Sequence, residues 1–172
     1  GFKTENGKSY YYKNGKKVKG WLTLNGKKYY FNASTGVQVK GWAKDRKGKR
    51  YFYNANGVKG YMATGWLTDS KKNTRYFNPS TGYMTTRWAT ISKKKYYFYS
   101  GNGVAAKSTF LTDTKKVTRY FTSKCFMATG WATNSKSQKR YFDPRTGAMY
   151  KGFKKIGNNT YYFYSGSGVM AT

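Results

Sequence analysis

The chain has 172 residues, and its 34 Lys and Arg residues against five Asp and Glu give a formal net charge of +29. It contains no His and one Cys, which excludes a Ser-His-Asp triad, a Cys-His pair, a His-containing metal site and an internal disulfide. Aromatic residues make up 20% of the chain, and no apolar run is long enough to span a bilayer, so we expect no transmembrane segment.

Residues 20–32 show the unit from which the chain is built. Trp21 and its neighbours supply one strand, and residues 29–31 supply an aromatic return strand, where such side chains are favoured. Asn25-Gly26 between them is the strongest two-residue hairpin signal, because a type I′ turn needs positive φ at both central residues. The stretch therefore predicts a β-hairpin, which needs neighbours because a lone hairpin is marginal in water.

This unit recurs along the whole chain. A leading aromatic returns every 19 to 24 residues, at Phe2, Trp21, Trp42, Trp66, Trp88, Phe110, Trp131 and Phe153. Aromatic clusters follow each of them, at residues 10–12, 29–31, 51–53, 76–77, 96–98, 120–121, 141–142 and 161–163. Connectors rich in Asn, Asp, Pro, Ser and Gly come next, as in residues 32–36, 78–82 and 143–147, and these residue types form turns.

Regular repeats of a marginal unit predict a solenoid, in which each hairpin buries its aromatics against the next. No amphipathic helical period is present. We therefore predict an all-β fold, a β-solenoid of about eight stacked β-hairpin repeats of ~21 residues. Residues 1–172 are expected to form a single repeat domain. Because the sequence begins with Gly1, we expect it to be a fragment of a larger secreted protein.

The acidic residues give no basis for catalysis. Asp69 and Asp113 each follow a leading aromatic by three residues, so they read as one structural position used twice. A glycosidase needs two carboxylates at a short fixed distance, which equivalent positions in separate repeats do not provide. The oxygen ligands are too dispersed for a calcium cage. We predict no catalytic residue, no metal site and no cofactor.

Aromatic rings and cations are the candidates for binding. Rings stack on sugars and attract quaternary ammonium groups, while a strongly basic balance points to polyanionic partners. We expect most tryptophans to pack between repeats, with a minority also open to a ligand. The predicted ligand-binding residues are Trp21, Lys28, Tyr29, Trp42, Arg50, Tyr51, Trp66, Trp88, Lys95, Tyr96 and Trp131.

Units of the form Gly-Trp-x-x-x-x-Gly-Lys-x-Tyr-Tyr-Phe-Asn-x-x-Thr-Gly-x-Met-x-Thr-Gly-Trp resemble the cell-wall-binding repeat superfamily. Residues 20–42 and 130–153 carry the resemblance best. The superfamily includes choline-binding modules of pneumococcal surface proteins and phage lysins, glucan-binding repeats of streptococcal glucansucrases, and receptor-binding repeats of large clostridial toxins. The resemblance implies hairpins stacked with roughly three-fold rotation, ligands held between successive hairpins, and attachment to surface glycopolymers of Gram-positive bacteria.

One departure from the choline-binding pattern bears on the ligand. Those repeats resemble Gly-x-Trp-Tyr-Tyr-Leu, and their Trp completes an ammonium cage. The matching residue here is Lys28, Arg50 or Lys95, and it is Ser9 or Thr160 in the end copies. In the shorter clusters Arg75, Arg119 and Arg140 precede Tyr-Phe. A fixed cation repels choline and attracts phosphate or carboxylate, so the sequence favours the glucan-binding and toxin-type repeats.

The sequence thus predicts a non-catalytic, secreted module at the cell surface. Its expected partner is a bacterial cell-wall glycopolymer, anionic and teichoic-acid-like, held by a Trp and a Tyr of one repeat, the leading ring of the next, and a cation at the rim. Two alternatives remain: a neutral α-glucan or host-glycan binding module, and a structural stalk or fibre that self-associates through its solenoid ends. Nucleic-acid binding by so basic a surface is expected as incidental.

Overall fold

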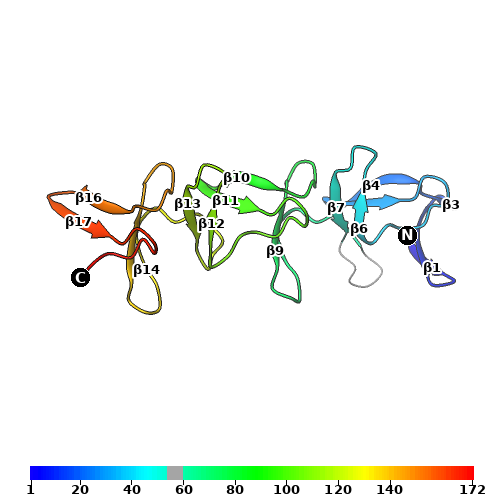
Figure 1. Cartoon of the computed structure of the whole chain (residues 1–172). Coiled ribbons are helices and arrows are strands. Elements are labelled where there is room, and N and C mark those ends of the chain that lie inside the picture. The colour runs from blue at the N-terminus through cyan, green and yellow to red at the C-terminus, as the bar shows by residue number, and fades with distance from the viewer. Residues whose placement is uncertain (54–59) are drawn as a thin grey trace. The chain divides into compact units, whose positions relative to one another are not determined.

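In the computed structural model, residues 1–53 and 60–172 are described. They form two compact units, Gly1–Thr85 and Thr86–Thr172. Both units consist of antiparallel hairpins joined by turns, and the described residues contain no helix and therefore no helical membrane span (Figure 1).

The first unit contains four hairpins. The first of them gains a short third strand, so its sheet has the order β1-β2-β3. The strands are β1 (Phe2–Glu5), β2 (Lys8–Lys13), β3 (Lys16–Lys17), β4 (Gly20–Leu24), β5 (Lys27–Phe31), β6 (Gly41–Lys44), β7 (Arg50–Tyr53), β8 (Gly65–Thr68) and β9 (Thr74–Phe77).

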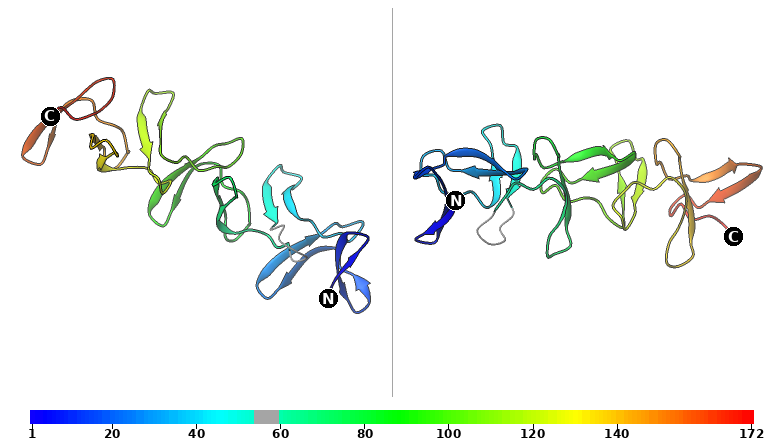
Figure 2. Two further views of the ribbon diagram at one scale, coloured as in Figure 1. Left: turned by 90° about the horizontal axis from the view of Figure 1, so that it is seen from below. Right: turned by 180° about the vertical axis from the view of Figure 1, so that it is seen from behind.

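The second unit contains four two-stranded hairpins. Successive hairpins are turned relative to one another, as β14–β15 and β16–β17 show in two views (Figures 1 and 2). The strands are β10 (Arg87–Ile91), β11 (Lys94–Phe98), β12 (Thr109–Thr112), β13 (Thr118–Phe121), β14 (Gly130–Thr133), β15 (Lys139–Phe142), β16 (Gly152–Ile156) and β17 (Asn159–Phe163).

The predicted hairpin at residues 20–32 is confirmed. Asn25 and Gly26 have φ values of 48° and 72°, as a type I′ turn requires. Trp21 lies opposite Tyr30 in the register, and Gly20 lies opposite Phe31. Because cross-strand partners share a face, each hairpin has a leading face that carries the leading aromatic and a closing face that carries the last ring of the return strand.

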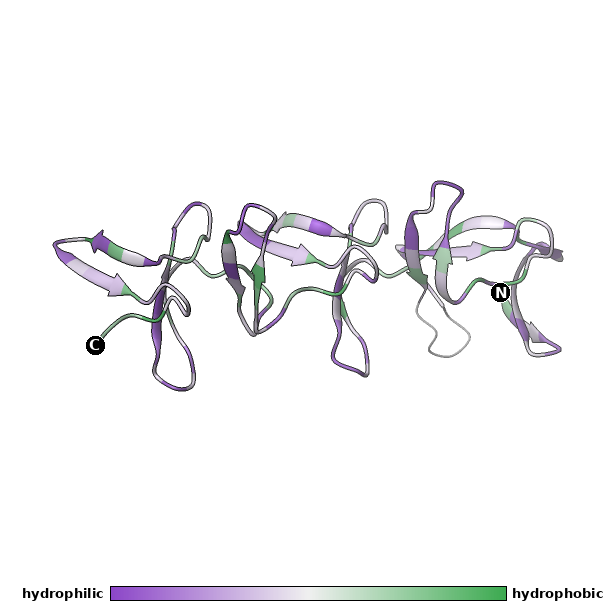
Figure 3. Ribbon diagram, viewed as in Figure 1, coloured by the Kyte–Doolittle hydropathy of each residue, from purple (hydrophilic) through white to green (hydrophobic). Residues whose placement is uncertain are grey.

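The closing rings form the core. In seven hairpins this ring is at most 2% exposed: Phe31, Tyr53, Phe77, Phe98, Phe121, Phe142 and Phe163. The leading face of one hairpin covers the closing face of the next within each unit. Trp88 lies 5.7 Å from Phe121, and Trp131 lies 5.9 Å from Phe163, between ring centroids. The core is therefore a series of ring contacts between successive hairpins, and the hairpin turns are hydrophilic (Figure 3).

Six of the linkers in the described residues fasten their hairpin to the preceding hairpin of the same unit through the backbone. The N–H of Met127 donates to the carbonyl of Lys95 in the preceding hairpin, and the next N–H, of Ala128, donates to Tyr120 in its own hairpin. The same bond to the preceding hairpin joins Gln38 to Ser9, Met62 to Lys28, Met84 to Arg50, Met149 to Thr118 and Met170 to Lys139. These bonds fix the position of one hairpin on the preceding one more firmly than side-chain packing alone would.

The connector glycines are required by packing as well as by backbone conformation. Gly147 has φ of 69°, and a Cβ added there would lie 2.5 Å from the Sδ of Met127. Gly82 stands in the same relation to Met62, and Gly168 to Met149. The Thr-Gly connector of one repeat therefore packs on the linker methionine of the repeat before it, which explains why both residues recur.

Candidate functional site

The leading rings are only partly covered. The five tryptophans are between 43% and 54% exposed, whereas we expected most of them to be packed between repeats. One side of each ring contacts a return-strand aromatic of its own hairpin: Trp21 lies 5.0 Å from Tyr30, and Trp131 lies 5.0 Å from Tyr141. For Trp21, Trp42, Trp88 and Trp131, the other side faces the closing face of the next hairpin in the same unit, which leaves a slot between the two hairpins.

The composition of these slots differs from the prediction in one respect. The expected second wall was the leading ring of the next repeat. The observed wall is the next return strand: Trp21 lies 6.2 Å from Tyr51, and Trp131 lies 5.0 Å from Tyr161. Residues two apart on a strand share a face, so the tyrosine two positions before the closing ring lies on the closing face. The leading ring of that hairpin lies on the opposite face and therefore does not line this slot.

The slots are of two kinds, which differ in the residue that lies two positions before the closing ring. In tyrosine slots it is Tyr29, Tyr51 or Tyr161. In arginine slots it is an arginine whose guanidinium lies over the preceding leading ring. Arg75 is 5.3 Å from the ring centroid of Trp42, Arg119 is 5.6 Å from that of Trp88, and Arg140 is 5.3 Å from that of Phe110. These arginines were noted in the sequence as cations before the shorter aromatic clusters, but they were not among the predicted ligand-binding residues. When the short and long aromatic clusters are aligned so that their closing rings match, these arginines occupy the same position as Tyr29 and Tyr51.

The tyrosines selected as ligand contacts are buried. Tyr29, Tyr51 and Tyr96 are between 4% and 8% exposed, and burial raises the pKa of all three phenols. They form slot walls and core, and direct ligand contact by these rings stays a prediction. Trp66 is 43% exposed and lies 5.0 Å from Tyr76 of its own hairpin.

The selected cations lie near the slots in two cases. Lys28 lines a hollow of about 420 Å³ together with Trp66, Tyr61 and Lys27. Lys95 lines a hollow of about 430 Å³ with Trp88, and its Nζ donates to the carbonyl of Arg145. Arg50 and Trp42 lie on neighbouring strands of one hairpin, and the carbonyl of Arg50 accepts from Met84.

The Trp88 slot brings several charged residues together. Trp88, Lys95, Arg119 and Arg145 all line it, and Asp113 is the one carboxylate in its lining. Arg119 donates to Asp113 Oδ2 over 2.8 Å and, through Nε, to the carbonyl of Thr146 over 2.9 Å. The slot therefore offers three cations against one anion beside a half-exposed indole ring.

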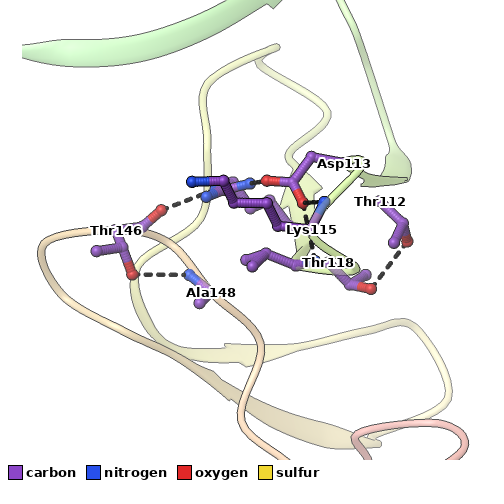
Figure 4. Close-up of polar contacts among 8 residues, drawn as sticks. Thr112, Asp113, Lys115, Thr118, Thr146 and Ala148 are labelled. Atoms are coloured by element: carbon purple, nitrogen blue, oxygen red, sulfur yellow. Dashed lines mark hydrogen bonds and ion pairs between the residues drawn. The ribbon is translucent and has the colours of Figure 1, made fainter.

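The acidic residue of this slot also shapes its hairpin turn (Figure 4). Asp113 Oδ1 accepts from the N–H groups of Lys115 and Val117. The hydrogen bond from Arg119, followed by the bond from Val117, lowers the pKa of the Asp113 carboxyl. Asp69 makes the equivalent turn and pairs with Arg75 at 2.9 Å, which lowers its pKa to about 2. The interpretation of Asp69 and Asp113 as one structural position is thus confirmed.

Two family models match the repeats. The model described as choline-binding repeat matches residues 18–59 and 115–152, and the model described as putative cell wall binding repeat matches residues 86–105 and 151–170. Together they span more than half of the chain. The chain belongs to the cell-wall-binding repeat superfamily. The narrower placement with glucan-binding and toxin-type repeats stays a prediction.

Solved structures with such repeats are similar to this chain. Choline-binding protein F from Streptococcus pneumoniae is 29% identical over 95% of the chain, with a TM-score of 0.75, and a structure of it in the presence of a peptidoglycan analogue gives 28% and 0.76. The Cpl-1 endolysin complexed with a peptidoglycan analogue is 32% identical over 63% of the chain and 31% of the endolysin, with a TM-score of 0.51. The chain spans 55% of the length of choline-binding protein F. No curated protein sequence matches it.

Proposed function

We propose that the chain is a non-catalytic binding module that attaches a secreted protein to the bacterial cell wall through many weak slots. The observation that carries this is the repetition of half-exposed leading rings, each facing the next return strand. Linked weak sites multiply into useful avidity when one polymer reaches several of them. The superfamily supports this reading, as do the structures of choline-binding protein F and the Cpl-1 endolysin with peptidoglycan analogues.

The favoured ligand is an anionic wall glycopolymer of the teichoic-acid type. The Trp88 slot supports it, because Lys95 and Arg145 line it in addition to the Arg119–Asp113 pair. The net charge of +29 supports it as well, since acidic side chains would keep the chain soluble as well as basic ones do. Nucleic-acid binding follows from the same charge and is incidental in this proposal.

The arrangement of hairpins proposed for this function is a solenoid. Backbone bonds from a linker to the preceding hairpin recur within each unit, and successive hairpins of a unit are turned relative to one another. Such winding would bring slots of the same kind to regular intervals along a polymer. Self-association through exposed rings such as Phe153, which is 79% exposed, is the rival that light scattering would detect.

A pull-down with intact Gram-positive walls, with and without extraction of teichoic acid, tests the proposal at two salt concentrations. We expect binding that falls after extraction and weakens at high salt, because exposed charges are screened. Equal binding to extracted walls would contradict the anionic ligand. Replacement of Trp88 by Ala and Lys95 by Gln should weaken binding, and a change of exposed Ser100 to Ala should leave it unchanged.

A neutral glycan is the second candidate, and the tyrosine slots favour it. The slots between Trp21 and Tyr51 and between Trp131 and Tyr161 have aromatic residues on both walls and no arginine at the position two before the closing ring. Such slots suit the flat face of a sugar or a quaternary ammonium group. Binding to dextran that survives high salt would establish the neutral ligand. Elution from walls by free choline would show that the ammonium group is recognised, which the cations at Lys28, Arg50 and Lys95 argue against.

A further inference from the structure

The three arginine slots are alike in their ring contacts and differ in what neutralises the arginine. Arg75 pairs with Asp69 at 2.9 Å, and Arg119 pairs with Asp113 at 2.8 Å. Each of these carboxylates lies in the turn of the same hairpin as its arginine. A charge that is already paired in this way has a smaller net attraction for an external anion.

The third slot has the same turn with an amide in place of the acid. Asn134 Oδ1 accepts from the N–H groups of Lys136 and Gln138, as Asp113 Oδ1 does from Lys115 and Val117. The other side-chain atom of Asn134 is Nδ2, which donates to Gln138 Oε1 over 2.9 Å. The turn geometry is therefore kept, while the acceptor for a guanidinium is replaced by a donor.

Arg140 is consequently held in place but not neutralised. Its guanidinium lies 5.3 Å from the ring centroid of Phe110, and its Nε donates to the carbonyl of Ser167 over 3.0 Å. Among the described residues, no carboxylate forms an ion pair with Arg140. The two terminal nitrogens remain as a pair of donors in a fixed plane, a geometry that matches carboxylate and phosphate oxygens.

A hollow of about 220 Å³ lies beside these donors. Phe110, Asn134, Arg140 and Ser108 are among the residues that line it, and its lining contains no acidic residue. Ser108 contributes a hydroxyl group to the lining. The Phe110 ring, 5.3 Å from the Arg140 guanidinium, also contacts the Tyr120 ring at a centroid separation of 4.7 Å. The hollow is large enough for one oxyanion group and its adjoining carbon atoms.

We propose that the slot of Arg140 is an oxyanion-binding site, which takes a phosphate or carboxylate group, and that Arg75 and Arg119 are withheld from the same role by their pairs with Asp69 and Asp113. The identity of the polymer that carries the oxyanion rests on the proposed function, but the site itself does not. The residue at the start of the hairpin turn decides whether the arginine can bind an external anion. An aspartate there pairs with the arginine, and an asparagine leaves it available.

The test uses the 172-residue chain and three variants. Asn134→Asp supplies the missing carboxylate and is expected to fold, because hairpins β8–β9 and β12–β13 already contain this pair. Asp113→Asn opens the Arg119 slot in the reverse experiment. Ser100→Asp carries the same charge change as Asn134→Asp at an exposed connector position of the same unit. Nuclear magnetic resonance of the arginine Nε–H groups follows each site during titration with inorganic phosphate and, separately, with glucuronate at constant ionic strength.

We expect saturable shifts at Arg140 in the wild-type chain, with the tighter of the two probes showing whether phosphate or carboxylate is preferred. Asn134→Asp should weaken that binding at least tenfold, and Ser100→Asp should change it less than twofold. Asp113→Asn should add a saturable response at Arg119. A linear, non-saturating response at Arg140, or equal titrations of Asn134→Asp and Ser100→Asp, would show solvated nitrogens without a site.

The wall pull-down separates this inference from the proposed function. If the wild-type chain fails to bind walls while Arg140 saturates with phosphate, the proposed function is wrong and the site stands. If the chain binds walls and Asn134→Asp titrates like Ser100→Asp, the site is wrong and the proposed function stands.

Discussion

The leading rings and the closing rings differ in how deeply they are buried, although both belong to the same repeating hairpin. Phe121, a closing ring, is fully buried, whereas Trp131, a leading ring, is 43% exposed. Both contact a neighbouring hairpin, since Phe121 receives Trp88 and Trp131 lies on Phe163. The difference teaches that the closing rings build the core while the leading rings stay half-exposed at the slots, so loss of stability and loss of binding should separate between the two kinds of ring.

The largest effect is expected from a closing ring. Phe121→Ala should lower the free energy of unfolding by about 3–5 kcal/mol, because it leaves a cavity between two hairpins. Urea unfolding followed by tryptophan fluorescence measures it, and Trp88 at 5.7 Å from Phe121 is a local reporter. Phe110→Ala is the control, since that leading ring is 43% exposed and should cost less. Equal losses for the two variants would contradict the division between faces.

The second largest effect is expected from substitution of a connector glycine. Gly147→Ala should cost about 2–4 kcal/mol, from strain at positive φ and from displacement of the buried Met127. The matched control is Gly101→Ala, where φ is not positive and a Cβ would meet no atom within 4 Å. The midpoint of thermal unfolding compares the two, and a loss no greater than that of Gly101→Ala would show that the Met127 contact is unimportant.

A leading ring should affect binding more than stability. Trp131→Ala is expected to cost about 1–2 kcal/mol, since only part of the indole is buried. Its affinity for isolated walls should fall while the circular dichroism spectrum of the chain is kept. Wild-type affinity for walls in this variant would remove the Trp131 slot from the proposal.

The smallest effect concerns the acidic pairs that close the arginine slots. The Arg75 hydrogen bond lowers the pKa of Asp69 from 3.8 to about 2. Because the folded-state pKa is the lower one, this contribution to stability is complete above about pH 5 and is lost as the pH falls through 2. Asp69→Asn should therefore be slightly less stable than the wild type at neutral pH, and the difference should vanish as the pH falls below 2. A constant difference across that range, measured by thermal unfolding, would argue against the ion pair.

Much of the site was outside the reach of sequence reasoning. Trp88 and Lys95 were both among the predicted ligand-binding residues, and the structure places them in one hollow. Arg119 and Arg140 were noted as cations but left out of that prediction, because their position over the ring of a different hairpin is not visible in the sequence. Tyr29 and Tyr51 were selected as ligand contacts but are buried, since local sequence does not reveal which face a neighbour covers.

The sequence by itself determined the hairpins, their number and their turns. Alternating aromatic strands, Asn25-Gly26 and the recurring connectors act within a few residues, and local backbone preferences are enough to specify them. Only the tertiary structure decided which ring of each hairpin is buried and which arginine is left without a carboxylate. Those outcomes depend on the direction in which one hairpin is laid on the next, and on linker bonds such as that from Met127 to Lys95, which join residues far apart in the chain.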